Sequence, residues 1–428
     1  MLFRPSSDQR RALAPRRRRR IFVAALVALL AMAAAPARAQ AVSIEAVAID
    51  GTTIEGAWGR VLDRDTVELT TLEGKRAVPL EDLAVIRFEN PESPPSGAVL
   101  FHPAGGGRLR GELLGSGSDA VTVRCVLGDP LVLSFDRLAG IQFAGERAHP
   151  PAEELFAKAL AEPPAGEDVL VTRGEGDAQV LRGRLERLDA QGGSFVFAGQ
   201  SRTFRLEKAF GVIFATGAAP PPAEPVSVTL TDGTTFSGSL RGGDDESLQI
   251  VTSFTTGLTL AAGNLSSLRF RSDRVVYLSD LATVTQRLEG RLHRPWPVRQ
   301  DRSPTGGTLS VAGRTFEKGL GVHSRAELVY DLGSEYERFA ATIGIDDAVR
   351  PRGSVVFRVL GDDRVLFDSG VVGGSDAPRD VVVEVHGVRL LTLVADYANE
   401  LDLADHAVWG GARLIKPSDR RPTRGSTN

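Results

Sequence analysis

The sequence contains a single cysteine, Cys125, and few large aromatic side chains, with three Trp and four Tyr in 428 residues. One thiol cannot form an internal disulfide bond, so packed hydrophobic cores must hold the fold together. Cys125 follows Val121 and Val123 at every second position, which is the period of a β-strand. The pattern predicts that Cys125 is a small buried side chain rather than a reactive thiol.

Motifs of catalytic sites are also missing. The six histidines are scattered singly, and no His-Glu-x-x-His metal motif is present. The carboxylate pairs Asp346-Asp347 and Asp362-Asp363 are sequence neighbours, and neighbours on a strand point to opposite faces. A glycosidase needs two carboxylates facing each other across a cleft. The sequence therefore predicts a protein that is not an enzyme.

Only one long apolar run is present, and it lies near the N-terminus. Arg16 to Arg20 are followed by fifteen apolar residues from Ile21 to Ala35, and then by Ala37-Arg38-Ala39. This order is typical of a secretory signal peptide covering residues 1–39. The alternative is an N-terminal membrane anchor, although a span takes about 20 residues. We predict an exported protein, periplasmic, cell-surface or secreted, and the general secretory and twin-arginine routes both stay open.

Removing the predicted signal peptide changes the charge of the chain. Residues 1–39 hold nine Arg and one Asp, which leaves 42 basic and 53 acidic side chains and a net charge of −11. An acidic chain has no electrostatic attraction to nucleic acid or to anionic lipid. We expect neither a nucleic-acid partner nor a membrane span after cleavage.

Four segments share a glycine in an early strand and a phenylalanine that closes the unit. The separation is 32 residues from Gly56 to Phe88 and from Gly111 to Phe143, 31 from Gly183 to Phe214, and 32 from Gly238 to Phe270. This regularity predicts four copies of one unit of about five short strands, small enough to close into an SH3-like or Sm-like barrel. The predicted repeats cover residues 40–90, 97–147, 167–216 and 225–272.

Residues 148–166 interrupt this series. They are rich in proline and contain a short helical stretch from Ala152 to Leu160. Such an insert indicates a linker that joins the first two units to the last two. We interpret the repeats as a scaffold or protein-contact region, and a ligand-binding role is the alternative.

The region after Tyr277 has longer strands and denser motifs. Its blocks include Lys318 to Ser324 (KGLGVHS), Tyr330 to Gly333 (YDLG), Ile343 to Asp347 (IGIDD), Gly353 to Val359 (GSVVFRV), Leu390 to Asp396 (LLTLVAD) and Asp405 to Trp409 (DHAVW). In this order and spacing they resemble the NPCBM family of carbohydrate-binding modules, over about residues 275–416. Residues 40–270 carry no such resemblance.

The resemblance implies a jelly-roll β-sandwich, galactose-binding-like in fold, that recognises galactose-like sugars. We place this module at residues 274–416, followed by a polar tail, residues 417–428, that we expect to be disordered. Two strand pairs are predicted within it. One joins Val355–Val359 to Val365–Asp368, and the other joins Val381–Val385 to Leu390–Ala395 around His386-Gly387.

A sugar site needs polar groups for the hydroxyls and an aromatic face for the apolar side of the ring. The candidate ligand-binding residues are His323, Asp346, Asp347, Asp405, His406, Trp409 and Trp296. The alternative is that His323 and Trp409 are core residues that hold the loops to the sandwich. For Trp296, the alternative is packing against the sandwich edge.

An acidic loop follows the strand that ends near Asp396. Asp396 and Asp402 offer carboxylate oxygens of the kind that calcium prefers, and a structural calcium ion is one interpretation. The loop lacks the spacing and the glycine of an EF-hand, and a solvated acidic loop is the other interpretation. No other cofactor is expected.

Together these patterns predict an all-β chain, with four small SH3/Sm-like β-barrel repeats followed by a jelly-roll β-sandwich. The leading hypothesis is an exported, non-catalytic glycan-binding protein. The alternative is a structural or protein-interaction protein of the cell surface or periplasm that binds no sugar. A third interpretation is an accessory protein that has lost its catalytic partner.

Overall fold

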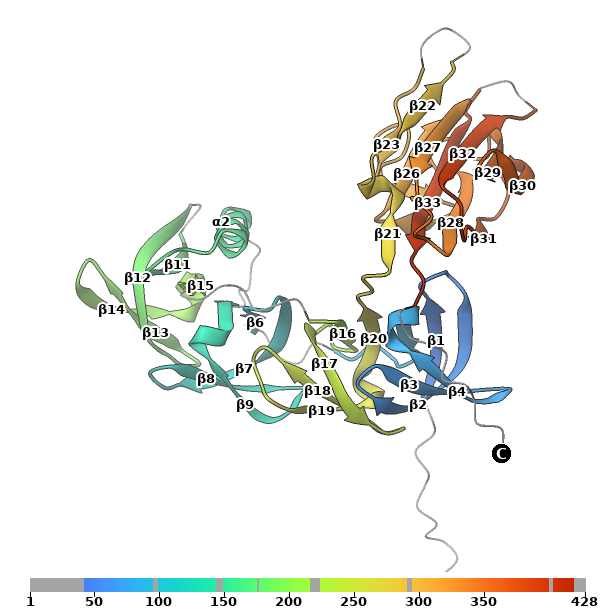
Figure 1. Ribbon diagram of the computed structural model, residues 1–428. Helices are drawn as coiled ribbons and strands as arrows, with labels where there is room; N and C mark the ends of the chain where they lie inside the picture. Colours follow the sequence, from blue (N-terminus) through green and yellow to red (C-terminus); the bar gives the residue numbers. More distant parts are fainter. Residues whose placement is uncertain are drawn as a thin grey trace, which may run out of the picture. The chain divides into compact units, whose positions relative to one another are not determined.

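The computed structural model describes residues 42–94, 99–143, 149–174, 177–215, 224–290, 295–399 and 403–418. Within these ranges β-strands are the predominant regular elements (Figure 1), as the alternating sequence patterns predicted. The predicted signal peptide and most of the polar tail lie outside the described residues. No helix of the described ranges is long and apolar enough to span a membrane.

Four successive segments repeat the same order of elements: four strands, a short 3₁₀ helix and a closing strand. Unit 1 consists of β1 (Ser43–Ala48), β2 (Thr53–Asp63), β3 (Thr66–Thr71), β4 (Gly74–Pro79), η1 (Leu80–Asp82) and β5 (Leu83–Phe88). Unit 2 consists of β6 (Val99–Pro103), β7 (Gly107–Ser116), β8 (Ala120–Cys125), β9 (Gly128–Ser134), η2 (Phe135–Arg137) and β10 (Leu138–Gln142).

Units 3 and 4 follow the same plan. Unit 3 consists of β11 (Asp168–Arg173), β12 (Ala178–Leu188), β13 (Gly192–Phe197), β14 (Gln200–Arg205), η3 (Leu206–Lys208) and β15 (Ala209–Ile213). Unit 4 consists of β16 (Val226–Leu230), β17 (Thr235–Gly243), β18 (Ser247–Thr252), β19 (Leu258–Ala261), η4 (Ala262–Asn264) and β20 (Leu265–Phe270). Cys125, at the end of β8, was predicted to be buried and is only partly buried.

The closing strands join the units in an order that the sequence did not predict. β5 pairs with β20, with Ile86 opposite Leu268, so unit 1 joins unit 4. β10 pairs with β15, with Ile141 opposite Val212, so unit 2 joins unit 3. The insert was expected to join a pair formed by units 1 and 2 to a pair formed by units 3 and 4. This grouping of the units was wrong. An edge strand pairs with whichever edge the folded chain brings beside it, and sequence proximity does not fix that partner.

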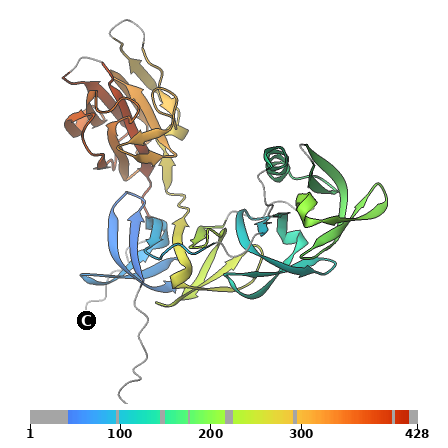
Figure 2. The same cartoon turned by 180° about the vertical axis from the view of Figure 1, so that it is seen from behind.

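Helix α2 (Pro150–Ala161) confirms the helix predicted in the insert. It begins after His149, whose Nδ1 accepts a hydrogen bond from the Ala152 backbone N–H at 3.2 Å. Its Phe156 packs against Phe210 with ring centroids 5.6 Å apart. The Phe156 ring also lies over Gly211, where no larger residue fits. A Cβ atom on Gly211 would lie 2.5 Å from the Phe156 ring. Figures 1 and 2 both place the helix beside unit 3, so this part of the insert is packed structure.

The C-terminal region is a sandwich of two antiparallel sheets with a small hairpin. One sheet has the order β23-β26-β33-β28-β31, with β21 also on β33, and the other has the order β22-β27-β32-β29-β30. The first sheet and the hairpin contain β21 (Val275–Tyr277), β23 (Arg299–Gln300), β26 (Gly319–His323), β28 (Arg338–Ile345), β31 (Arg379–Glu384), β33 (His406–Ile415), β24 (Leu309–Val311) and β25 (Arg314–Phe316). The second sheet contains β22 (Thr285–Leu288), β27 (Ala326–Asp331), β29 (Ser354–Gly361), β30 (Arg364–Gly373) and β32 (Leu390–Tyr397), and η5 (Leu278–Asp280) follows β21.

One of the two predicted strand pairs is present and the other is not. β29 and β30 form the predicted hairpin around Asp362. β31 and β32 do not pair, because β31 pairs with β28 in one sheet while β32 pairs with β27 and β29 in the other. The turn at His386-Gly387 carries the chain from one sheet to the other. Alternating strands separated by a short turn fit a hairpin and a sheet-to-sheet crossing equally well.

The sandwich also packs against unit 1, within the compact unit that the chain forms from Val42 onward. Arg413 donates through Nε to the carbonyl oxygen of Ile49 at 2.5 Å, and Arg338 forms an ion pair with Asp50 at 2.7 Å. Ile49, Ala340 and Ile415 are buried together. Burial at this contact lowers the pKa of Arg413. The sandwich therefore has to be studied in the chain that includes unit 1.

Candidate functional site

Two histidines lie side by side where two neighbouring strands of the sandwich meet. His323 ends β26, His406 begins β33, and the two residues are directly opposite in the antiparallel register. Side chains of such a cross-strand pair lie on the same face of the sheet. Their ring centroids are 5.4 Å apart, and both residues are buried, at 8 % and 6 % exposed. The strand register, and not a local motif, creates this pair.

Trp296 covers the histidine pair from a loop that precedes β23. Its indole is stacked on His323, with centroids 4.9 Å apart and planes only 10° from parallel, and it lies 5.2 Å from His406. Trp296 is 41 % exposed, whereas both histidines beneath it are buried. The neighbouring Pro295 and Pro297 restrict the loop backbone. The arrangement is an indole held on a buried support with part of its surface open to solvent.

The buried histidines provide polar groups beside this indole. His323 donates from Nδ1 to the carbonyl oxygen of Ser324 at 2.8 Å, which leaves its Nε2 as an acceptor in the neutral ring. The Nδ1 of His406 is buried and has no hydrogen-bond partner among the described residues. Burial, together with repulsion from His323, lowers the pKa of His406 to about 4. His406 is therefore neutral at pH 7 and presents one donor and one acceptor.

The lowered pKa of His406 makes the stability of the sandwich sensitive to acid. Below pH 6.5 the unfolded chain takes up a proton at this residue, but the folded chain does not until about pH 4. The free energy of unfolding should therefore fall by at most about 3 kcal/mol as the pH drops from 6.5 to 4. Denaturant titrations at pH 7.5, 5.5 and 4.5 measure this loss.

The control for this prediction is the variant His406→Gln. Burial raises the pKa of nearby Asp346, so protonation of this carboxyl group stabilises the folded chain as the pH falls. This contribution is the same in wild type and variant. The difference between wild type and variant isolates His406. An identical pH profile in the two proteins contradicts the prediction.

Two of the three carboxylates predicted at the site, Asp346 and Asp347, have different surroundings. Asp346 is 1 % exposed and follows β28 beside His406, whose carbonyl oxygen accepts a hydrogen bond from the Asp346 backbone N–H at 2.9 Å. Its Oδ2 is buried and has no hydrogen-bond partner among the described residues. Asp347 instead accepts a hydrogen bond from the Gly313 backbone N–H at 2.9 Å, and so holds the β24–β25 turn. Only Asp346 lies next to the histidine pair.

Two other predicted site residues are placed as internal supports. Trp409 is 1 % exposed and lies between Phe339 and Phe357, with centroids 6.2 and 5.1 Å away, so the alternative that it is a core residue fits its position. Asp405 is fully buried and accepts hydrogen bonds from the Ser324 hydroxyl at 2.7 Å and the Ser354 backbone N–H at 2.9 Å. Neither side chain is available to a ligand in this conformation.

The acidic loop after β32 offers little to a cation. Asp396 forms an ion pair with Arg358 at 2.9 Å, and Arg325 lies 3.8 Å from its other oxygen. Asp402 lies outside the described residues. In the described part of the chain, no group of three or more His, Cys, Asp or Glu side chains is arranged to hold a metal ion. The positions of the two arginines favour charge neutralisation of Asp396 by protein groups.

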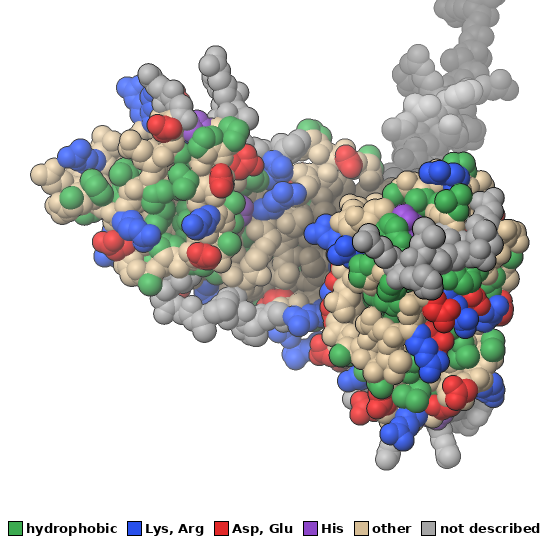
Figure 3. Space-filling view, turned by 90° about the horizontal axis from the view of Figure 1, so that it is seen from above, with side chains coloured by type: hydrophobic (Ala, Val, Ile, Leu, Met, Phe, Trp, Pro, Cys, Tyr) green, Lys and Arg blue, Asp and Glu red, His purple; other side chains and the backbone are tan. Residues whose placement is uncertain are grey.

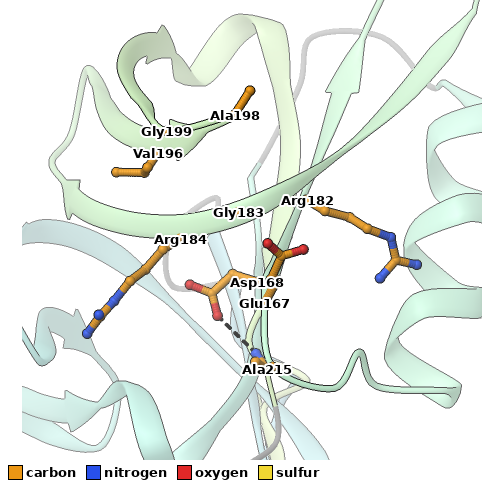
Figure 4. A pocket seen from close by; sticks show the side chains of 10 residues that line it. Glu167, Asp168, Arg182, Gly183, Arg184, Val196, Ala198, Gly199 and Ala215 are labelled. Atoms are coloured by element: carbon orange, nitrogen blue, oxygen red, sulfur yellow. Dashed lines mark hydrogen bonds between the residues drawn. The ribbon is translucent and has the colours of Figure 1, made fainter.

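A separate cleft of about 420 Å³ lies in unit 3, and its polar groups do not converge. Figure 4 shows Arg182 and Arg184 on its wall pointing away from each other. Both carboxylate oxygens of Asp168 already accept hydrogen bonds, from the backbone N–H groups of Leu185 and Ala215 at 2.9 Å each. This cleft does not present a set of side chains directed at one ligand.

The sequence reasoning missed the serines that support the site. Ser324 and Ser354 bind Asp405, and Ser303 is buried close to Asp346. Serine is common in loops, and single serines carry no pattern that points to a site. The one available signal was the position of Ser324 directly after His323, inside the KGLGVHS block.

Comparison with known proteins supports the predicted resemblance. The family model described as the NPCBM/NEW2 domain matches residues 274–415. The chain is 39 % identical over 146 residues to the protein named "Putative endo-alpha-N-acetylgalactosaminidase" of Renibacterium salmoninarum, covering 32 % of this chain and 9 % of that protein. It is 33 % identical over 116 residues to the alpha-1,3-galactosidase B of Akkermansia muciniphila, covering 26 % of this chain and 14 % of that protein. The chain thus spans only a small part of these relatives.

The solved structures that resemble this chain include CBM51 carbohydrate-binding modules. One is CBM51 from Clostridium perfringens GH95 in complex with methyl-galactose, 28 % identical, covering 33 % of this chain and 99 % of that one, with a TM-score of 0.30. Another contains CBM51-2 in complex with GlcNAc and INT domains from Clostridium perfringens ZmpB, 28 % identical, covering 40 % of this chain and 37 % of that one, with a TM-score of 0.31. Residues 274–415, which match the NPCBM/NEW2 family model, are hereafter called the module.

Proposed function

We propose that the protein is an exported, non-catalytic glycan-binding protein whose module recognises galactose-like sugars at Trp296. The observation that carries the proposal is the indole of Trp296, 41 % exposed and stacked on buried His323. The apolar face of a pyranose ring packs on such an aromatic surface, and a site on a rigid support loses little entropy when it binds.

The polar groups around this indole are suited to hydroxyl groups. The ring nitrogens of His323 and His406 can donate and accept hydrogen bonds, and Asp346 is joined to His406 by a backbone hydrogen bond. The matched family is one of carbohydrate-binding modules, and one relative is named as a galactosidase and another as an N-acetylgalactosaminidase. Galactose-like sugars are therefore the ligand class that the proposal names.

The surface charge and the sequence outside the module agree with this role. On the face in Figure 3, acidic and basic side chains are interspersed, without the extended basic surface that a nucleic acid would require. Export is inferred from residues 1–39, and the four units would then display the module away from its attachment point or partner.

The proposal is tested by titration calorimetry of the chain from residue 40 onward with methyl-galactoside and with N-acetylgalactosamine, in the presence and absence of calcium. Saturable binding of at least one sugar is expected, unchanged by calcium. Trp296→Ala should weaken binding at least about tenfold, which corresponds to 1.4 kcal/mol of lost stacking. Trp296→Phe, which keeps an aromatic face, should retain most of the affinity.

Val382→Ala is the matched control, because Val382 is an exposed apolar residue on β31 of the same sandwich. It should leave the affinity unchanged. Failure of every galactoside to bind would favour the alternative of a structural or protein-interaction protein. Binding that persists in Trp296→Ala would place the sugar elsewhere on the module.

A further inference from the structure

The junction of units 1 and 4 contains two equivalent positions, because the two units meet through equivalent strands. β5 and β20 pair about Ile86 and Leu268, which occupy the same place in their units. Gly56 on β2 corresponds to Gly238 on β17, so Trp58 corresponds to Leu240. The registers agree, because Trp58 is opposite Leu69 and Leu240 is opposite Ile250. Unit 1 faces the β17–β18 turn of unit 4, and unit 4 faces the β2–β3 turn of unit 1.

Trp58 fills the first of these two positions. It is 1 % exposed, packs on Phe88 with ring centroids 5.5 Å apart, and donates from Nε1 to the carbonyl oxygen of Asp244 at 2.8 Å. Asp244 belongs to the β17–β18 turn of unit 4. An indole inserted between the closing strand of its own unit and the turn of the other unit thus seals this side of the junction.

The second position has no such side chain, because unit 4 carries Leu240 in place of a tryptophan. A cleft of about 400 Å³ is found there. Its apolar lining residues are Leu80, Val226, Leu240 and Phe270, and Phe270 corresponds to Phe88 at the filled position. The turn of unit 1 that faces it contributes Arg64 and Asp65. The cleft in unit 4 therefore corresponds to the space that Trp58 fills in unit 1.

The charged side chains that line this cleft are three arginines and two carboxylates, an excess of one positive charge. Arg64, Arg241 and Arg271 line it, and none of them forms an ion pair within the described part of the chain. Two carboxylates also line it, Asp65 and Glu81, and Glu81 accepts a hydrogen bond from the Ser418 hydroxyl at 2.7 Å. Because the arginines outnumber the carboxylates and apolar residues also line the cleft, the site favours an anionic ligand that has an apolar part.

We infer that this cleft, between η1, β17 and β20, binds an acidic peptide segment of another protein that inserts an aromatic side chain. The bound indole would lie on Leu240 and Phe270 as Trp58 lies on Phe88, and carboxylates on either side of it would meet the three arginines. An extended peptide fits better than a sugar, because the filled position already holds a polypeptide indole by a hydrogen bond to a turn carbonyl. This binding is independent of the sugar site on the module.

The test uses fluorescence anisotropy of a fluorescein-labelled peptide, Glu-Asp-Trp-Asp-Glu, with the chain from residue 40 onward. Saturable binding with a Kd below about 1 mM is expected, weakened by added salt. Leu240→Trp fills the cleft with the residue that unit 1 already accommodates, and it should weaken binding at least about tenfold. Arg271→Glu should do the same by reversing the charge of one lining arginine.

Two controls accompany these variants. Arg202→Glu reverses an exposed arginine on β14 of unit 3 and should leave binding unchanged, and a peptide with Ala in place of Trp should bind at least about tenfold more weakly. The inference is overturned by the lack of saturable binding up to about 1 mM, or by full affinity in both Leu240→Trp and Arg271→Glu. It is equally overturned if a uronic-acid oligosaccharide binds at the cleft and the peptide does not.

Discussion

Replacing Trp409 by Ala should destabilise the fold of the module rather than only weaken sugar binding. Trp409 is 1 % exposed and lies edge-on to Phe339 and Phe357, in the centre of the core between the two sheets. Truncating a buried tryptophan removes its transfer free energy and leaves a cavity, at a cost of about 3–5 kcal/mol. In scanning calorimetry, the transition of the module should move down by about 10 °C or more.

The control for this prediction is Trp296→Ala in the same chain. Its indole is 41 % exposed, and its loss should change the unfolding temperature little while the sugar affinity falls. Together the two variants separate a core tryptophan from a ligand-binding one. If Trp409→Ala keeps the stability of wild type and loses only binding, the core interpretation of Trp409 is wrong.

Replacing Asp405 by Ala should destabilise the module by about 3–5 kcal/mol. The carboxylate is fully buried and accepts one hydrogen bond from the Ser324 hydroxyl and one from the Ser354 backbone N–H. Hydrogen bonds to a charged group contribute about 1.5–3 kcal/mol each, and their loss leaves buried donors unpaired. Equilibrium denaturation with urea measures the change.

Asp405→Asn is the matched variant. Its carbonyl oxygen can still accept from Ser354, and its amide group can donate to the Ser324 oxygen, so the loss of stability should be smaller than in Asp405→Ala. The alanine variant should also weaken sugar binding, because Asp405 holds the residue after His323 in place. Equal stability of wild type and Asp405→Ala would show that the two hydrogen bonds contribute nothing to folding.

Much of the strand architecture could be predicted from local patterns. The separation of 31 or 32 residues between glycine and closing phenylalanine predicted four units, and the structure gives each of them the same order of strands and 3₁₀ helix. Alternation of apolar and polar residues located β29 and β30 and their turn at Asp362. These features depend on residues close in sequence, so a single sequence contains them.

The partners of edge strands depend on distant parts of the chain. Neither the pairing of β5 with β20 nor the separation of β31 and β32 into different sheets follows from any local pattern. The same holds for the candidate site. His323 and His406 are 83 positions apart, and only the antiparallel register of β26 and β33 makes them neighbours.

The sequence alone determined the all-β class, the repeated units, the likeness of residues 275–416 to carbohydrate-binding modules and the identities of the aromatic candidates. Only the tertiary structure decided which candidates face solvent. It placed Trp296 on the histidine pair and buried Trp409 and Asp405, because exposure depends on what the opposite sheet and the neighbouring loops cover. It also left a cleft beside Leu240 of unit 4. At the equivalent position of unit 1, Trp58 fills the space.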